Sequence, residues 1–180
     1  VTIYLRLHWD RQMQEKYYRS KSVYKRGYMG EKVIAVSGGF DPIHVGHLRM
    51  MQDAAQHGRL VVIVNSDEWL LRKKGYVFMP WEERAELIGA YDFVDEVVMA
   101  KDDNRTVVES LEEIKPDIFA NGGDRGNVNT PEVRFCRENG IEMMWGVGGH
   151  KVQSSSSMVT SVTQKKRSKD LKKFRDQVAY

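Results

Sequence analysis

The sequence predicts an α/β fold in which a five-stranded parallel sheet carries helices on both faces. From residue 32 onward, short apolar runs alternate with amphipathic stretches, which is the pattern of strands joined by helical crossovers. The chain has 180 residues, 41% of them hydrophobic, and this suits one compact domain. Because such crossovers are almost always right-handed, we expect an open, doubly wound, Rossmann-like sheet with ligands at the carboxyl ends of its strands.

The strands and the first helix each have a local signal. The first helix, Val45–Gln56, places Leu48, Met51 and Ala55 on one face, and Gly58 ends it. The five apolar runs predict strands at Lys32–Ser37, Leu60–Asn65, Glu96–Met99, Asp117–Ala120 and Ile141–Trp145.

Three further helices fill the remaining gaps between strands. They are predicted at Trp81–Ala90, Val107–Ile114 and Glu132–Asn139. The first of them follows Pro80 and carries Glu82 and Glu83 in its first turn, where acidic groups suit the positive helix end. Lys115-Pro116 ends the second and Gly140 ends the third.

Charge divides the chain into three parts. Residues 1–30 carry seven basic and two acidic side chains, residues 31–164 carry 14 and 21, and residues 165–180 carry seven and two. We expect residues 31–164 to form the domain. Residues 1–30 are expected to be a basic extension without a fold of its own, since Met29 directly precedes the first strand-like run. A last helix docked on the domain or on a second subunit is favoured for residues 165–180 over a surface for anionic lipid or nucleic acid.

Cysteine content and hydropathy exclude two classes of protein. The single cysteine, Cys136, cannot form an internal disulfide, so a cytoplasmic location is expected. No stretch approaches the roughly 18 uncharged apolar residues that a membrane span needs, and residues 1–30 lack the apolar run of a secretory signal. A soluble domain is therefore expected, neither membrane-spanning nor held together by disulfides.

The first strand leads into the most informative segment, Ser37-Gly38-Gly39-Phe40-Asp41-Pro42-Ile43-His44-Val45-Gly46-His47. Two glycines allow a tight turn and the close approach of a ligand, and the helix start that follows favours an anion. His44 and His47 are three residues apart, so both imidazoles are expected to point toward that anion. A polyphosphate could hold them protonated at neutral pH, and Gly46 would leave room for a base. Surface capping is the simpler alternative, but the coincidence of strand, glycines and helix disfavours it.

Residues 38–47 read Gly-x-Phe-Asp-x-x-His-x-Gly-His, and in this the sequence resembles the cytidylyltransferase-like nucleotidyltransferases. The resemblance extends from residue 32 to about residue 162. It is closest to the small members that activate glycerol 3-phosphate or heptose 1-phosphate. It implies attack by a substrate phosphate on the α-phosphate of CTP or ATP, release of pyrophosphate, assistance by Mg²⁺ and a homodimer. Mg²⁺ is expected to be held mainly by the triphosphate, without a metal site on the protein.

The resemblance also assigns roles to single residues. It makes His44, His47, Lys73 and Lys74 the catalytic candidates and Asp67 the candidate for binding the acceptor. The nucleotide-binding candidates are drawn from the first turn, the helix after Pro80, a Gly-Gly-Asp turn and a serine run, and they are Gly38, Gly39, Phe40, Asp41, Gly46, Arg84, Gly122, Gly123, Asp124, Arg125, Ser154, Ser155 and Ser156.

Simpler roles stay open for several of these residues. Asp41 and Asp67 could cap turns, and Arg72–Lys74 could be a solvated loop. The turn at Gly122–Asp124 could be purely structural, and the serine run could be a flexible linker.

Two departures from the glycerol-phosphate enzymes leave the choice between CTP and ATP open. Those enzymes have an arginine where this chain has Asp92, and an Arg-Thr pair where it has Gly149-His150. The Gly-Gly-Asp turn favours the heptose-phosphate adenylyl enzymes instead.

The sequence therefore predicts a nucleotidyltransferase that moves CMP or AMP to a phosphorylated sugar or polyol. The alternative is a catalytically inactive nucleotide-binding module whose basic tails bind RNA. The enzyme requires the imidazoles and the serine hydroxyls to meet at one cavity of triphosphate size.

Overall fold

A computed structural model describes residues 30–101, 105–122, 130–150 and 152–162. Its five parallel strands form one sheet in the order β3-β2-β1-β4-β5. The strands are β1 (Val33–Gly38), β2 (Arg59–Val64), β3 (Glu96–Met99), β4 (Ile118–Gly122) and β5 (Glu142–Val147). The predicted fold class and all five strands are confirmed, with their ends shifted by at most two residues. The predicted basic ends of the chain lie outside the described residues, apart from Gly30.

The four predicted helices are also present. They are α2 (Val45–Ala54), which continues into the short helix η1 (Ala55–His57), α4 (Trp81–Gly89), α5 (Val108–Ile114) and α6 (Pro131–Glu138). Residues 155–162 are helical as well. Among the described helices, none has both the length and the apolar character needed to cross a membrane.

One helix, α3 (Asp67–Lys74), forms where the sequence suggested a basic loop. Ser66 caps its start, with its hydroxyl accepting a hydrogen bond of 3.0 Å from the backbone N–H of Trp69. Gly75 ends it in the left-handed conformation, where it donates to the carbonyl of Leu71. The cap and the glycine therefore make the basic run the last turn of a helix.

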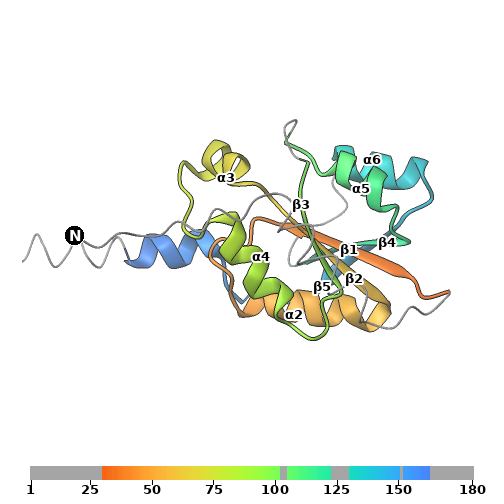
Figure 1. The fold of residues 1–180 in the computed structure, drawn as a ribbon, viewed down its shortest axis with the longest axis horizontal. Helices are drawn as coiled ribbons and strands as arrows, with labels where there is room; N and C mark the ends of the chain where they lie inside the picture. Colours follow the sequence, from red (N-terminus) through yellow and green to blue (C-terminus); the bar gives the residue numbers. More distant parts are fainter. Residues whose placement is uncertain (1–29, 102–104, 123–129, 151, 163–180) are drawn as a thin grey trace, which may run out of the picture.

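The helices cover both faces of the sheet (Figure 1). Alternate residues of β1 face opposite sides, so Ile34 and Val36 pack with the buried side chains of α2 and α4. Ala35 packs in a second cluster with Leu111 of α5 and Cys136 of α6. Two apolar cores therefore hold β1 between them, and its end is fixed from both sides.

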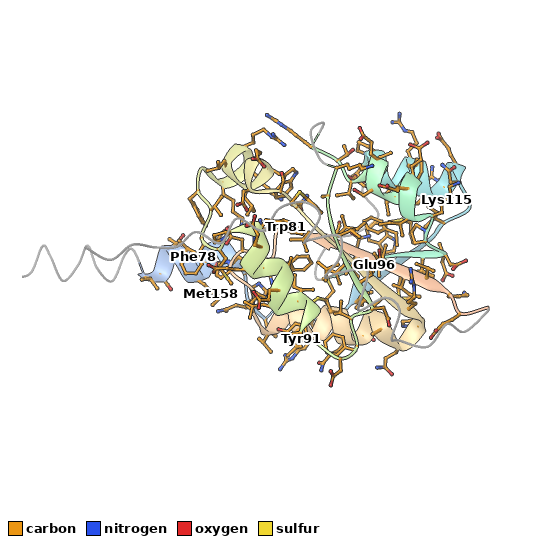
Figure 2. The ribbon with its side chains drawn as sticks, in the orientation of Figure 1. Phe78, Trp81, Tyr91, Glu96, Lys115 and Met158 are labelled. Carbon is orange, nitrogen blue, oxygen red and sulfur yellow. The ribbon has the colours of Figure 1, made fainter. Side chains whose placement is uncertain are left out.

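Helix α4 is anchored at its first residue, Trp81 (Figure 2). The indole is 5% exposed, and its Nε1 donates a hydrogen bond of 3.2 Å to the carbonyl of Val64, the last residue of β2. Phe78, three residues earlier, is 58% exposed. The chain thus turns inward at Trp81, which fixes the start of α4 against the carboxyl end of the sheet.

The neighbouring strands β1 and β4 define where a ligand can bind. β1 and β4 are neighbours, but the chain passes from β1 to β2 and β3 on one side and returns to β4 and β5 on the other. At such a reversal the connections leave in opposite directions, which opens a crevice outside the strand ends. This crevice is where the predicted site residues belong.

Gly148 marks the closest approach between the end of β5 and helix α2. Its φ is +80°, and a Cβ there would lie 2.6 Å from both Cα and N of Met50. Gly149 has a similar φ of +74° but open space around it. We expect Gly149→Ala to cost about 1 kcal/mol through backbone conformation alone, and Gly148→Ala to cost at least about 2 kcal/mol more because the helix must move. Urea unfolding of the two variants measures the difference, and equal losses would contradict the close packing.

Candidate functional site

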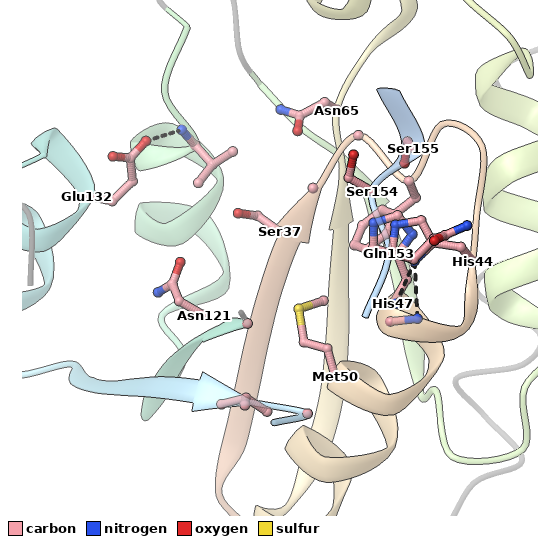
Figure 3. A pocket seen from close by; sticks show the side chains of 18 of the residues that line it. Ser37, His44, His47, Met50, Asn65, Asn121, Glu132, Gln153, Ser154 and Ser155 are labelled. Carbon is pink, nitrogen blue, oxygen red and sulfur yellow. Dashed lines mark hydrogen bonds between the residues drawn. The ribbon is translucent and has the colours of Figure 1, made fainter. Parts of the chain in front are cut away.

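A cavity of about 600 Å³ lies at the carboxyl ends of β1 and β4 (Figure 3). Its walls come from the turn after β1, the start of α2, the end of α3, the ends of β4 and β5, and residues 152–156. The imidazoles of His44 and His47 and the serine run therefore meet at one cavity. Its volume lies within the range of small-molecule sites, roughly 300–1,000 Å³.

Twelve of the predicted site residues line this cavity. They are Gly38, Gly39, Phe40, His44, Gly46, His47, Lys73, Lys74, Gly122, Ser154, Ser155 and Ser156. Asp41, Asp67 and Arg84 are not among the lining residues, and for these three the structure gives other roles. Gly123, Asp124 and Arg125 lie outside the described residues.

Arg84 is a structural residue beneath the site. Its side chain is fully buried, and its Nη1 donates to the carbonyls of Gly39 at 2.6 Å and Asn65 at 2.9 Å. Its Nε donates to the carbonyl of Met79 at 2.9 Å, and its Nη2 pairs with Asp67 at 2.5 Å. The prediction that Arg84 contacts nucleotide is corrected, because its guanidinium is engaged with the loops after β1 and β2. The same ion pair engages Asp67, the predicted acceptor ligand.

Asp41 caps the loop before α4, the simpler of its two predicted roles. It is fully buried, and its carboxylate accepts hydrogen bonds from the backbone N–H groups of Phe78 at 3.0 Å and Met79 at 2.7 Å. Its carbonyl accepts a 2.8 Å hydrogen bond from Nζ of Lys74. Asp41 therefore points away from the cavity and instead positions a lysine that lines it.

The two lysines at the end of α3 are held differently. The pKa of Lys74 lies below its ordinary value, mainly because the side chain is partly buried. The nearby Asp41 carboxylate raises this pKa, and the positive charge of Arg84 lowers it. Nζ of Lys73 lies 4.2 Å from the ring centroid of Trp69, within the range of a cation–π contact. Both lysines line the cavity from the end of α3.

The imidazoles of His44 and His47 are stacked, with centroids 3.7 Å apart and planes 16° from parallel. Nδ1 of His44 accepts hydrogen bonds from the backbone N–H groups of Gly46 at 3.1 Å and His47 at 3.4 Å, so this side chain caps α2. An accepting Nδ1 leaves the proton of the neutral ring on Nε2. His44 is therefore a hydrogen-bond donor without the added proton that the sequence suggested.

Burial keeps both rings neutral in the free protein. It lowers the pKa of His47 to about 3, with the neighbouring His44 and Lys74 acting in the same direction. Burial is also the main cause that lowers the pKa of His44, with Lys74 adding to it. Nδ1 of His47 is buried without a hydrogen-bond partner in the described part of the chain. A bound anion would offset these effects by favouring the charged form.

The glycines of the turn make room for protein side chains. A Cβ at Gly46 would lie 3.0 Å from Cε1 of His44, so glycine permits the capping imidazole to fold back over the helix start. A Cβ at Gly39 would lie 2.8 Å from Leu70. The predicted role of these glycines in admitting a ligand is thus joined by a packing role, because His44 and Leu70 occupy the space beside them.

The serine run is the start of a helix and is tied to the histidine turn. Ser154 caps residues 155–162, with its Oγ accepting a 3.1 Å hydrogen bond from the backbone N–H of Ser157. Ser155 is 9% exposed, and its hydroxyl donates to the carbonyl of Pro42 at 2.9 Å. The run is therefore an ordered cavity wall, and Ser155 fixes its distance from the imidazoles.

Comparison with known proteins shows the family of this chain. Residues 35–134 match the cytidylyltransferase-like family, which is more than half of the chain. The chain belongs to the cytidylyltransferase-like family. The curated protein HldE of Alcanivorax borkumensis, described as bifunctional, is 41% identical over 117 residues, which are 63% of this chain and 24% of that protein. HldE of Gluconobacter oxydans, with the same description, is 42% identical over 98 residues, 53% of this chain and 20% of that protein.

The relatives differ from this family member in length. The chain spans a fifth to a quarter of the HldE proteins that it matches. A crystal structure of the lipopolysaccharide core biosynthesis protein from Thermoplasma volcanium has a TM-score of 0.55 and 23% identity, and the match covers 68% of this chain and all of that one. That likeness supports the fold, which this cytidylyltransferase-like chain shares.

Several cavity residues of this family member were not predicted. Asn65 follows β2, Trp69 lies on α3 and Met50 on α2, and the remaining unpredicted residues of interest are Ser37, Asn121, Glu132, Trp145 and Gln153. Position at the carboxyl end of a strand was the available signal for Asn65 and Asn121. Glu132 and Trp145 gave no such signal, because helix packing and strand register bring them to the cavity.

The described residues do not fit a metal cage on the protein. They contain no group of three His, Cys, Asp or Glu side chains placed to share an ion. Asp41, the carboxylate nearest to the histidines in sequence, is taken up by backbone N–H groups. Binding of Mg²⁺ through nucleotide phosphates stays a prediction.

Removal of the Arg84 guanidinium should destabilise the domain. Arg84→Met leaves three carbonyls and the Asp67 carboxylate without this partner, and we expect a loss of about 3–5 kcal/mol in the free energy of unfolding. Arg134→Met, at an exposed position on α6, should change it by no more than about 0.5 kcal/mol. Urea denaturation of both variants tests this, and similar losses would show that the buried network contributes little.

The buried, neutral His47 should make stability depend on pH. The unfolded chain binds a proton at this residue below pH 6.5, whereas the folded chain binds one only near pH 3. Stability is therefore fully present above pH 6.5 and falls as the pH drops, by at most about 1.4 kcal/mol per pH unit. His47→Gln should flatten this part of the curve of unfolding free energy against pH. Parallel curves for the two proteins would contradict a neutral, buried ring.

Proposed function

We propose that this chain transfers a CMP or AMP moiety from CTP or ATP to a small phosphorylated acceptor, a sugar or polyol phosphate, with release of pyrophosphate. The observation that carries the proposal is that His44, His47 and the serine run line one cavity. Membership of the cytidylyltransferase-like family supports it.

The chemistry needs positioning and charge stabilisation more than a protein nucleophile. An oxygen of the acceptor phosphate attacks the α-phosphorus, and the bond from that phosphorus to the bridging oxygen breaks. Pyrophosphate leaves with the electron pair. Charge grows on the phosphate oxygens during this step, so fixed donors that point at them lower the barrier.

Three groups of this chain supply such donors in the proposal. Nε2–H of His44 donates to a phosphate oxygen, since capping of α2 holds its tautomer. His47 gains a proton as the triphosphate binds beside it, because the anion offsets the burial that lowers its pKa. Lys73 or Lys74 bridges the acceptor phosphate and the α-phosphate.

The leaving pyrophosphate is assigned to the start of the helix at residues 155–162. Backbone N–H groups at a helix start attract anions, and the capping Ser154 and the exposed Ser156 line the cavity there. Ser155 is a positioning residue, because its hydroxyl is used by the carbonyl of Pro42.

The inactive RNA-binding module remains the rival proposal. Its basic tails lie outside the described residues apart from Gly30, whereas His44, His47, Lys73 and Lys74 line the cavity. The rival requires salt-sensitive RNA binding without pyrophosphate release. A homodimer and a cytoplasmic location stay predictions from the sequence.

Pyrophosphate release tests the proposal. The unaltered protein should turn over CTP or ATP with at least one of a panel of sugar and polyol phosphates. His47→Asn should lower kcat about 10²- to 10³-fold, the loss typical of one preorganised donor. His57→Asn, at an exposed position ending η1, is the matched control and should retain the parental rate. A folded His47→Asn protein with unchanged turnover would overturn the assigned role.

A further inference from the structure

Helix α3 brings an aromatic ring and a lysine together at the cavity. Nζ of Lys73 lies 4.2 Å from the centroid of the Trp69 ring. The two residues are four apart in α3, so they lie on consecutive turns of one helix face, and the side chain of the later residue leans back over the earlier one. Both residues line the cavity. The contact therefore belongs to the cavity wall and not to a remote surface of the helix.

The indole of Trp69 is itself held in place. The backbone N–H of Trp69 donates a hydrogen bond of 3.0 Å to the hydroxyl of Ser66, which caps α3. The next residue, Leu70, is fully buried. A Cβ at Gly39 would lie 2.8 Å from Leu70 and 3.7 Å from Cζ3 of the indole. The ring is thus next to the glycine turn after β1 as well as to the ammonium group of Lys73.

The neighbouring lysine is in contact with a different neutral group. Nζ of Lys74 donates a hydrogen bond of 2.8 Å to the carbonyl of Asp41. A carbonyl and an indole both attract an ammonium group without cancelling its charge, whereas a carboxylate neutralises it. An ammonium group has three N–H donors, so a ring on one side leaves donors for phosphate oxygens. The end of α3 therefore has the means to present two positive charges in fixed positions.

A fixed position matters more for Lys73 than for most side chains. Lysine is among the residues that lose the most rotamer freedom when they become ordered. Lys73 is exposed, so its ammonium group would sample many positions without a partner nearby. A ring that favours one position before the substrate arrives reduces the cost of ordering the side chain on binding.

We propose that Trp69 is a positioning residue for the reaction: its indole holds the ammonium group of Lys73 at the cavity, where that group binds a substrate phosphate. This inference rests on the proposed nucleotidyl transfer. It gives a role to a cavity residue that no motif of the sequence indicated. Trp69 acts through Lys73, so its replacement should have no effect once the lysine is gone.

A double-mutant cycle tests this dependence. Pyrophosphate release with the preferred acceptor gives kcat/KM for the unaltered protein, Trp69→Leu, Lys73→Met and the double variant. A cation–π contact near the surface corresponds to a factor of about 2 to 5. We expect Trp69→Leu to lower kcat/KM by about that factor in the unaltered protein and to cause no further loss in Lys73→Met. Equal losses in both backgrounds, or an unchanged rate in Lys73→Met, would overturn the inference.

Three further variants separate the ring contact from packing and from general charge. Trp69→Phe keeps an aromatic face and should lose less activity than Trp69→Leu, and equal losses would mean a packing role and reject the inference. Trp69→Met repeats the test with another apolar side chain, so the result does not depend on one variant folding. Arg72→Met removes a positive charge from the same turn of α3 at a residue that does not line the cavity, and should leave the rate unchanged. A loss as large as that of Lys73→Met would reject a specific role for Lys73.

The contact also has a spectroscopic signature that does not require turnover. The ring current of the indole should shift the NMR signals of the protons on Cε of Lys73 upfield. Trp69→Leu should remove this shift and leave the corresponding signals of Lys101, an exposed lysine after β3, unchanged. Unshifted Lys73 signals in the unaltered protein would contradict the inference directly.

Failure of the proposed function can be told apart from failure of this inference. If the unaltered protein releases no pyrophosphate with any acceptor, the proposed function fails. Calorimetric binding of ATP and CTP then tests the inference separately. Trp69→Leu should weaken binding of at least one of them about 2- to 5-fold, and only where Lys73 is present. Equal weakening with and without Lys73, or no weakening with either nucleotide, would reject the positioning role.

Discussion

The buried guanidinium of Arg84 is the interaction on which the site depends. It binds the carbonyl of Gly39 after β1 and the carbonyl of Asn65 after β2, and it pairs with Asp67 at the start of α3. These three segments are separate in the sequence. The first two contain cavity residues, and the third begins the helix that carries Lys73 and Lys74. A neutral side chain could not neutralise Asp67 and satisfy two carbonyls together. The charge of Arg84 therefore stabilises the loops around the cavity. The positive charges that line the cavity belong to other residues.

Strand alternation then divides the cavity by chemistry. Along β1, Val36 packs with α2, whereas Ala35 packs with α5 and α6, and alternation puts Ser37 on the same side as Ala35. The turn after Gly38 places His44 at the start of α2, in the first layer. The second layer contributes an amide, a hydroxyl and one carboxylate. The end of β1 thus separates a part of the cavity lined by imidazoles from a part lined by an amide, a hydroxyl and a carboxylate.

The sequence predicted most of the fold, because the strands are continuous apolar runs and the helices have clear stops. It missed α3, because residues 67–74 are mostly charged. The positions of His44 and His47 were predicted, because their spacing in the motif determines where they lie at the helix start. Arg84 was misassigned because its partners are backbone carbonyls of distant loops, which leave no trace in residue type. Asn121 and Trp145 come together only through strand register, which periodicity alone does not give.

The histidine pair shows why the protonation of the site can differ between the free and the ligand-bound protein. Two protonated rings at a centroid distance of 3.7 Å would repel each other, and burial adds to that cost, so the empty cavity favours neutral imidazoles. His44 can donate in this state because its capping bond fixes the proton on Nε2. His47 has no such constraint on its buried Nδ1. In the proposed reaction the two positions have different roles: the fold sets the donor on His44 before binding, and His47 would gain its charge from a bound anion, so the charge on the site would depend on occupancy.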